Sequence, residues 1–246
     1  MSQFKEGQPV PNVTLTVIEN DVSKQVQSAE LFAGKNVVLF ALPGAFTPTC
    51  SSTHLPRFNE LAPVFANEGV DKIYCLSVND AFVMDAWAAD QGAGHIAFLA
   101  DGNGEFSKGM GMLVDKTANG MGERSWRYSM LVKDGTIEKM FVEPNKPGDP
   151  FEVSDADTML RYINPNAQLP RRVTILTKPG CPHCGRAKNL LDNKGYKYEE
   201  ISLGHEGLSY STLVAVSGAT TTPQVFVEGQ CIGGADELEQ WFAQQT

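Results

Sequence analysis

The sequence has 246 residues, of which 42 % are hydrophobic and 20 % charged, as is typical of a soluble protein with one large domain or two ordinary ones. Its formal net charge of −9 and the lack of a basic stripe argue against nucleic acid or an anionic membrane surface as partner. The sequence contains no run of about 18 apolar residues, so we expect no membrane-spanning helix. The polar segment 1–11 lacks a signal-peptide core, so we expect a cytoplasmic protein.

The first part of the chain alternates strand-like and helix-like segments. Residues 36–42 are a short apolar run, typical of a strand that is buried on both faces of a sheet. Apolar side chains then recur at helical spacing over residues 55–65, where Pro56 and Pro63 predict a kink or a late start. A strand over 72–78, a helix over 81–90 capped by Asn79-Asp80 and a strand over 96–99 are expected next.

A hairpin and a short helix complete this part. Residues 127–132 and 137–142 are expected to pair across the turn 133–135. Ser154 is expected to cap a helix that reaches Ile163, with Asp157 in place of the usual capping-box glutamate. Alternating strands and helices that end in a hairpin predict a mixed α/β sheet flanked by helices.

Residues 164–170 are polar, contain two prolines and show no periodicity, which is typical of a linker between domains. We therefore expect one domain over 1–163 and a second over 171–246. In the second domain, strands are expected over 172–177, 198–203, 224–227 and 231–232, and helices over 185–191, 209–216 and 237–242.

The five cysteines do not suggest a disulfide framework, because their number is odd and no secretion signal is evident. In a reducing compartment such residues are more often buried, catalytic or metal-binding. They are Cys50, Cys75, Cys181, Cys184 and Cys231.

Cys50 lies between the expected strand 36–42 and the following helix. Unpaired backbone N–H groups at a helix start favour a thiolate, which is the form that attacks or is oxidised. Position alone also fits a packed small hydrophobic residue.

The residues around Cys50 carry a more specific signal. Pro43, Thr47 and Cys50 have the spacing P-x-x-x-T-x-x-C, and residues 126–130 read W-R-Y-S-M. Over residues 1–163 the chain resembles the type-5 (atypical) peroxiredoxins. The resemblance implies that Cys50 attacks the peroxide and that Arg127 stabilises the thiolate and the separating oxygens. It also implies that Thr47 hydrogen-bonds thiolate and peroxide, and that Pro43 shields the pocket from water.

The chain departs from some of these relatives in one respect, because residues 151–154 contain no second, resolving cysteine. Cys75, in the middle of the expected strand 72–78, is most simply a buried packing residue. Cys50 then needs a thiol from outside its own domain. For His54, one helical turn after Cys50, a structural or interface role is the simplest interpretation.

A second site is indicated by Cys181-Pro182-His183-Cys184 at the junction of a strand and a helix. This C-x-x-C spacing is typical of a redox dithiol, with Cys181 exposed at the helix start and Cys184 one turn deeper. The alternative is half of a zinc site, but no second paired spacing supplies the other ligands, so no metal is expected.

Residues 171–246 resemble a glutaredoxin in three places: 178–184, 221–226 and 231–236. The resemblance implies a cis Pro223 that turns the Thr222 backbone toward the dithiol. It also implies that Lys178 meets the glycine carboxylate of glutathione. The γ-glutamyl end would lie at the turn and helix start formed by Gly234, Ala235 and Asp236. Cys231 is interpreted as a strand-packing residue or an oxidation-prone spectator.

Together the two resemblances imply two thioredoxin-like domains joined by a short linker, in which the second domain re-reduces Cys50. The implied activity is reduction of hydrogen peroxide and alkyl hydroperoxides with glutathione as co-substrate. No permanently bound cofactor is expected, and a separate NADPH-dependent reductase would recycle glutathione, because no dinucleotide fingerprint occurs. The linker is short, so the second domain could re-reduce Cys50 either within one chain or between the subunits of a dimer or larger homo-oligomer.

Two other functions remain as alternatives. One is a general protein-disulfide or deglutathionylating oxidoreductase whose first domain recruits targets. The other is a redox sensor or an iron–sulfur carrier built on glutaredoxin and glutathione.

Overall fold

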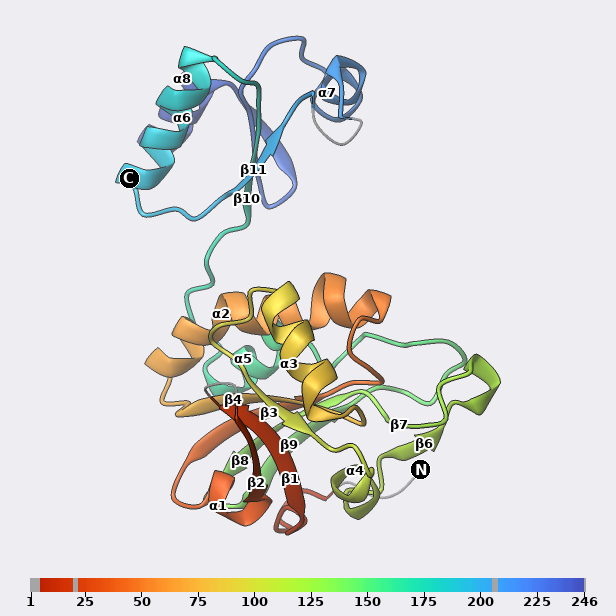
Figure 1. The fold of residues 1–246 in the computed structure, drawn as a ribbon. Helices are drawn as coiled ribbons and strands as arrows, with labels where there is room; N and C mark the ends of the chain where they lie inside the picture. Colours follow the sequence, from red (N-terminus) through yellow and green to blue (C-terminus); the bar gives the residue numbers. More distant parts are fainter. Residues whose placement is uncertain (1–4, 20–21, 205–207, 246) are drawn as a thin grey trace. The chain divides into compact units, whose positions relative to one another are not determined.

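The computed structural model describes residues 5–19, 22–204 and 208–245. The chain divides into two compact units, Met1–Gln168 and Leu169–Thr246, and the division falls within the polar stretch 164–170 (Figure 1). None of the helices in the described ranges is long and apolar enough to cross a membrane.

The first unit is built on a seven-stranded sheet with the order β2-β1-β5-β4-β3-β8-β9. The strand β3 pairs in parallel with β4 and antiparallel with β8, so the expected mixed sheet is confirmed. A small separate ribbon is formed by β6 (Leu113–Asp115) and β7 (Glu123–Ser125). The main strands are β1 (Thr14–Glu19), β2 (Val22–Gln27), β3 (Asn36–Ala41), β4 (Lys72–Ser77), β5 (Ala97–Ala100), β8 (Tyr128–Lys133) and β9 (Thr136–Val142).

Helices cover both faces of this sheet. In Figure 1, α2, α3 and α5 lie on one side of the strands, and α1 and α4 lie on the other. Because successive side chains of a strand point to opposite faces, the buried β3 contributes to both layers. The helical elements are α1 (Ser28–Phe32), the π-helix η1 (Cys50–His54), α2 (Leu55–Asn67), α3 (Ala81–Asp90), α4 (Glu105–Gly109), the 3-10 turn η2 (Thr117–Asn119) and α5 (Ala156–Ile163).

The prolines of the second helical segment are accommodated without ending the α-helix. The π-helix η1 comes first, and α2 then begins at Leu55 with Pro56 in its first turn, where no helical N–H bond is required. Pro63 is accommodated inside α2. Because helical residues run up to Leu55 and α2 begins at the first residue of the expected segment, the expected late start is wrong.

The expected cap of α5 is wrong by one residue. Asp155 is the N-cap, and its carboxylate accepts a hydrogen bond from Thr158 N at 2.9 Å. Ser154 is fully buried, and both its backbone N–H and its hydroxyl donate to Glu143 instead. Asp157 forms an ion pair with Arg57 at 2.7 Å. A buried carboxylate needs hydrogen-bond donors. Glu143 receives them from the N–H and the hydroxyl of Ser154, which are the groups that a capping box at Ser154 would use.

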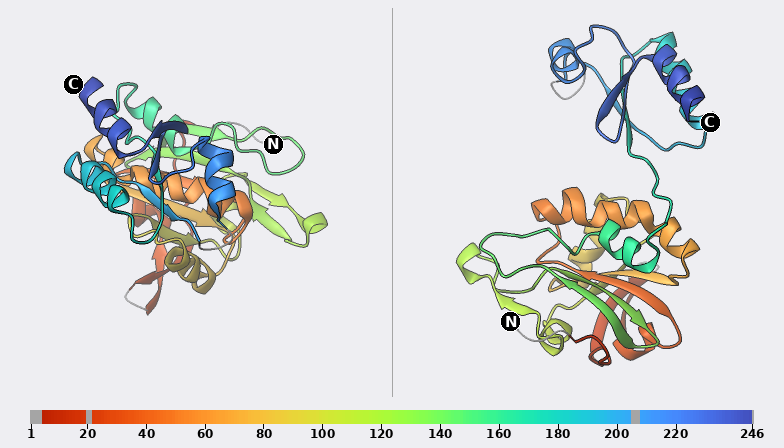
Figure 2. Two further views of the ribbon diagram at one scale, coloured as in Figure 1. Left: turned by 90° about the horizontal axis from the view of Figure 1, so that it is seen from above. Right: turned by 180° about the vertical axis from the view of Figure 1, so that it is seen from behind.

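The second unit has a four-stranded sheet with the order β11-β10-β12-β13 and three helices. The helices α6 and α8 lie together on one face, and α7 lies on the other (Figure 2). Alternation along β10 explains these two layers, because Ile175 packs toward α6 and α8 while Leu176 packs toward α7. The elements are β10 (Val173–Thr177), α6 (Pro182–Asn193), β11 (Glu199–Ser202), α7 (Tyr210–Ser217), β12 (Gln224–Val227), β13 (Gln230–Gly233) and α8 (Ala235–Gln244).

Candidate active sites

The first site begins where the buried strand β3 ends. The chain runs from Ala41 through the buried Pro43 to Cys50, which is the first residue of η1 and is fully buried. The helical turn is closed by Ser51 N, which donates to Thr47 O at 3.0 Å. Short π-helical turns are frequent at functional sites. The sheet thus supplies a rigid base for a cysteine at a helix start.

Arg127 lies next to this cysteine although it is 77 residues away along the chain. Its guanidinium is 1 % exposed, and Nη1 donates to Cys50 Sγ at 3.5 Å. Nη2 forms an ion pair with the Asp149 carboxylate. Burial alone would lower the pKa of Arg127, but the hydrogen bond to Asp149 and the negative charge of Cys50 raise it. The site therefore holds a permanent positive charge against the sulfur.

His54 is a second partner of Arg127. Its Nε2 lies 3.1 Å from Ser154 O, which can only accept, so Nε2 carries the proton. Nδ1 then accepts from Arg127 Nη1 at 3.1 Å. Burial and the neighbouring charge of Arg127 lower the pKa of His54 to about 3, so the ring is neutral. These contacts agree with the structural role expected for His54.

The segment between β9 and α5 lies against this cluster. The buried Glu143 carboxylate accepts hydrogen bonds from the N–H groups of residues 152–154 at 2.8–2.9 Å. This anchors a segment whose Phe151 ring lies 5.6 Å from Arg127 Cζ and 4.9 Å from the His54 ring. Sequence reasoning missed Asp149, Phe151 and Glu143, because the segment is polar, rich in proline and without periodicity.

The Thr47 hydroxyl donates to Gly44 O at 2.9 Å. Its proton is therefore used within the loop, and its oxygen remains able to accept a hydrogen bond from a ligand.

Cys75 is fully buried on β4, and burial raises its pKa well above the ordinary value. It stays a thiol, and the expected packing role is confirmed.

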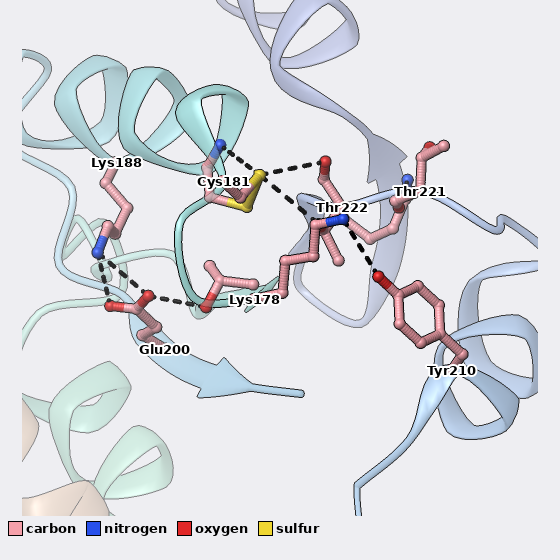
Figure 3. Close-up of a disulfide and its surroundings, with 10 residues drawn as sticks. Lys178, Cys181, Lys188, Glu200, Tyr210, Thr221 and Thr222 are labelled. Atoms are coloured by element: carbon pink, nitrogen blue, oxygen red, sulfur yellow. Dashed lines mark hydrogen bonds and ion pairs between the residues drawn. A yellow bond between two sulfur atoms is a disulfide. The ribbon is translucent and has the colours of Figure 1, made fainter. Parts of the chain in front are cut away.

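The second site is the disulfide between Cys181 and Cys184 (Figure 3). Cys181 is the N-cap of α6, and its Sγ accepts a hydrogen bond from Cys184 N at 3.2 Å. Cys181 is half-buried and Cys184 is 3 % exposed, so the expected difference in depth is confirmed. The expected cis peptide at Thr222-Pro223 is also present. Thr222 Oγ1 donates to Cys181 Sγ at 3.6 Å, and Thr222 O lies equally far from that sulfur.

The remaining glutaredoxin-type residues lie at two places around this dithiol. Lys178 Nζ donates to the hydroxyl of Tyr210 at 3.2 Å, a partner that the sequence did not suggest (Figure 3). At the start of α8, Gly234 N donates to Glu237 Oε2 at 2.9 Å, and Asp236 is paired with Arg186. The N–H of the N-cap residue Gly234 is thus bonded to the side chain of Glu237, as in one half of a capping box.

Cys231 is exposed on β13, so the packing interpretation of this residue is wrong. This strand is the edge strand of the four-stranded sheet and pairs only with β12 in the described part of the second unit. Within the described ranges, no group of three or more histidine, cysteine, aspartate or glutamate side chains could hold a metal ion.

Comparison with known proteins decides the family. The Redoxin family matches residues 5–160, and the Glutaredoxin family matches residues 173–232. The hybrid peroxiredoxin hyPrx5 of Haemophilus influenzae is 59 % identical over 238 residues, which cover 97 % of this chain and 98 % of that protein. The chain belongs to the hybrid peroxiredoxins.

Two further relatives match a smaller share of the chain. The peroxiredoxin sll1621 of Synechocystis is 63 % identical over 138 residues, covering 54 % of this chain and 73 % of that one. The crystal structure of reduced Prx3 from Vibrio vulnificus in complex with H2O2 is 45 % identical with a TM-score of 0.62. It covers 65 % of this chain and 99 % of its own. This hybrid peroxiredoxin is therefore an oxidoreductase of the peroxidase class, with a thioredoxin-like Redoxin domain followed by a glutaredoxin domain.

Proposed function

We propose that this chain reduces hydrogen peroxide and alkyl hydroperoxides at Cys50 and draws the electrons from glutathione through Cys181. The observation that carries the proposal is the contact of 3.5 Å between Arg127 and Cys50 in a chain that also holds the Cys181–Cys184 pair. One site suits peroxide and the other suits thiol–disulfide exchange. The H2O2 bound to the Vibrio vulnificus relative supports peroxide as the oxidant.

In the first step the Cys50 thiolate attacks one peroxide oxygen. An S–O bond forms, and the O–O bond breaks with its electron pair on the second oxygen. That oxygen takes a proton and leaves as water or an alcohol, while the sulfur is oxidised to sulfenic acid. The charge of Arg127 stabilises the thiolate and the leaving oxygen. The Thr47 oxygen can accept a hydrogen bond from the peroxide, and the buried Pro43 keeps water out.

In the second step a glutathione thiolate attacks the Cys50 sulfur. An S–S bond forms and the S–O bond breaks; the departing hydroxide takes the proton lost by the glutathione thiol and leaves as water, and a mixed disulfide remains on Cys50. Cys181 then attacks the glutathione sulfur and releases the Cys50 thiolate. A second glutathione attacks the mixed disulfide on Cys181 and leaves as glutathione disulfide. In total, one hydroperoxide and two glutathiones give water, water or alcohol, and one glutathione disulfide.

Glutathione would bind around Cys181 through the residues that surround the dithiol. Lys178 suits the glycine carboxylate, and the backbone of Thr222 before Pro223 faces the sulfur within 3.6 Å. Gly234, Ala235 and Asp236 suit the γ-glutamyl end at the positive end of the α8 dipole. Binding would then break the hydrogen bond that Glu237 Oε2 accepts from Gly234 N in the structure.

Recycling of glutathione by a separate NADPH-dependent reductase completes the cycle, in a reducing compartment such as the cytoplasm. The linker 164–170 can span only about 23–25 Å, but tethering still gives the second unit an effective concentration on the order of mM. Assembly into a dimer or a larger homo-oligomer would also allow transfer between subunits.

Mass spectrometry of Cys50 after one equivalent of peroxide tests the proposal. Without glutathione, a gain of one oxygen on Cys50 is expected. With glutathione, the oxygen is replaced by a glutathione adduct that disappears with time. Cys50→Ser should abolish peroxide turnover and leave dithiol activity at Cys181 intact. Cys75→Ser is the matched control, because that thiol is equally buried. Peroxide turnover that persists in Cys50→Ser overturns the assignment.

A further inference from the structure

The loop that carries Thr47 is bonded to the end of the neighbouring strand β4. Ser77 is fully buried there, and its hydroxyl lies 3.3 Å from Leu42 O, where the loop begins. Two residues later, Asn79 Oδ1 accepts a hydrogen bond from Ala45 N at 3.1 Å. The same oxygen accepts from the Ser77 hydroxyl at 2.8 Å. One carboxamide oxygen therefore joins the middle of the loop to the sheet.

Both polar groups of the peptide bond between Gly44 and Ala45 are hydrogen-bonded. Its N–H donates to Asn79 Oδ1, and its carbonyl oxygen accepts from the Thr47 hydroxyl at 2.9 Å. The peptide is also closely packed, since a Cβ at Gly44 would lie only 3.3 Å from Thr47 Cγ2 and 3.4 Å from Met121 Cε. The direction of the Thr47 hydroxyl thus depends on the orientation of this peptide.

Phe46, which lies between this peptide and Thr47, adopts a left-handed backbone conformation with a φ of 61°. This conformation is unfavourable for a bulky residue and persists only where the surrounding contacts fix it. The Phe46 side chain is 54 % exposed, so packing of its ring contributes little. The hydrogen bond at the preceding residue, from Ala45 N to Asn79 Oδ1, is therefore one of the contacts that hold the loop in this conformation.

We propose that Asn79 is a positioning residue for peroxide reduction, which sets the direction of the Thr47 hydroxyl through the Gly44–Ala45 peptide. With this peptide fixed, the Thr47 proton is directed to Gly44 O, and the Thr47 oxygen is left to accept from the O–H of the peroxide. When the acceptor at residue 79 is lost, the peptide can rotate and move this oxygen away from the peroxide. The inference rests on the proposed reduction of peroxide at Cys50.

The test compares two substitutions of Asn79 in the single-turnover reduction of H2O2, followed by stopped flow. Asn79→Leu removes the acceptor and should slow the reaction about tenfold, because a small misplacement of a positioning group is costly. Asn79→Asp keeps an oxygen for both donors and should stay within about threefold of the wild type. Asn59→Leu is the matched control and should leave the rate unchanged, because Asn59 Oδ1 also accepts from a backbone N–H, that of His95, at 3.1 Å.

Thr47→Val shows whether Asn79 acts through the Thr47 hydroxyl. In this background, Asn79→Leu should slow the reaction by less than about twofold further, since the group that it positions is already absent. A full tenfold loss there would mean a general structural role and overturns the inference, as does an unchanged rate in Asn79→Leu or an equal loss in Asn79→Asp. If Asn79→Leu does not fold, Asn79→Ala replaces it, because alanine also lacks the acceptor and adds no bulk. If the wild-type chain does not reduce H2O2, the proposed function fails instead.

Discussion

At the scale of single residues, the first site depends on how one arginine is held. Arg127 is buried, and it contacts Asp149, His54 and Cys50 at the same time. Asp149 and His54 do not reach the sulfur through any hydrogen bond in the structure, so we regard them as positioning residues. Their effect on peroxide reduction should then be smaller than that of Arg127 itself.

Asp149→Asn should slow peroxide reduction by about three- to tenfold, because an amide oxygen still accepts from Arg127 but carries no charge. Arg127→Ala should slow it by one or more decades, as loss of a charge-stabilising donor does. Stopped-flow measurement of peroxide consumption in a single turnover gives both values. Glu152→Gln is the control, since this exposed carboxylate on the same segment pairs with Lys146. An Asp149→Asn rate equal to that of the control would contradict the positioning role.

His54 predicts an acid-dependent loss of stability. Its pKa is about 3 in the folded chain and near 6.5 when unfolded, so the unfolded chain binds the additional proton between these values. Stability therefore falls as pH decreases below about 6.5, by about 1.4 kcal/mol per pH unit for this group. His54→Gln keeps one donor for Ser154 O and one acceptor for Arg127 without titrating.

Between pH 7 and pH 5, the wild-type chain should thus lose about 2 kcal/mol more unfolding free energy than His54→Gln. Chemical denaturation at the two pH values measures this difference. His95→Gln, at an exposed histidine, should behave as the wild type does. If His54→Gln has the same pH dependence as the wild type, His54 titrates normally in the folded protein.

At the scale of elements, α5 shows how a buried carboxylate displaces a local signal. Glu143 takes both donors of Ser154, and Asp155 caps the helix instead. Asp155→Ala should therefore lower the unfolding free energy by about 1 kcal/mol, whereas Asp155→Asn should cost only a few tenths, because asparagine also caps well. Urea denaturation of the two variants compares them directly. Equal losses would show that the side-chain cap at Asp155 contributes nothing to stability.

At the scale of the whole molecule, the two cysteines of the second unit should divide the work. A glutathione mixed disulfide on Cys181 can be resolved by glutathione from solution, so Cys184 is not needed for that step. Cys181→Ser should stop glutathione-driven peroxide turnover, and Cys184→Ser should keep a substantial part of it. Steady-state assays at saturating glutathione decide this. If Cys184→Ser is as inactive as Cys181→Ser, reduction proceeds through the dithiol.

A further prediction concerns whether Cys181 of one chain can reduce Cys50 of another chain. A mixture of Cys50→Ser and Cys181→Ser chains contains one intact Redoxin unit and one intact glutaredoxin unit on different molecules. Cys181 of one chain can attack the glutathione mixed disulfide on Cys50 of another chain. The mixture should therefore recover part of the turnover, and the recovery should increase with the concentration of the Cys50→Ser chain. A mixture as inactive as either variant alone would restrict transfer to units of the same chain.

The sequence by itself determined the features that depend on neighbours along the chain. The strand β3 before Cys50, the helix start at Cys181 and the boundary within 164–170 follow from short patterns of apolar, proline and cysteine residues. The cis Thr222-Pro223 bond was implied by the glutaredoxin resemblance. The family resemblance of both parts rested on the same local motifs. These features can be predicted from the sequence because strand formation, helix ends and peptide geometry depend on residues a few positions apart.

Only the tertiary structure decided which side chains meet across the fold. Asp149 reaches Arg127 from a segment without periodicity, and Tyr210 reaches Lys178 from an element 32 residues away. The capping of α5 changed because Glu143 is buried and takes donors from the next segment. Such contacts depend on which strands are adjacent and on where a buried charge must find partners. Neither condition is expressed in the local pattern of residues, so these contacts appear only when the chain is folded.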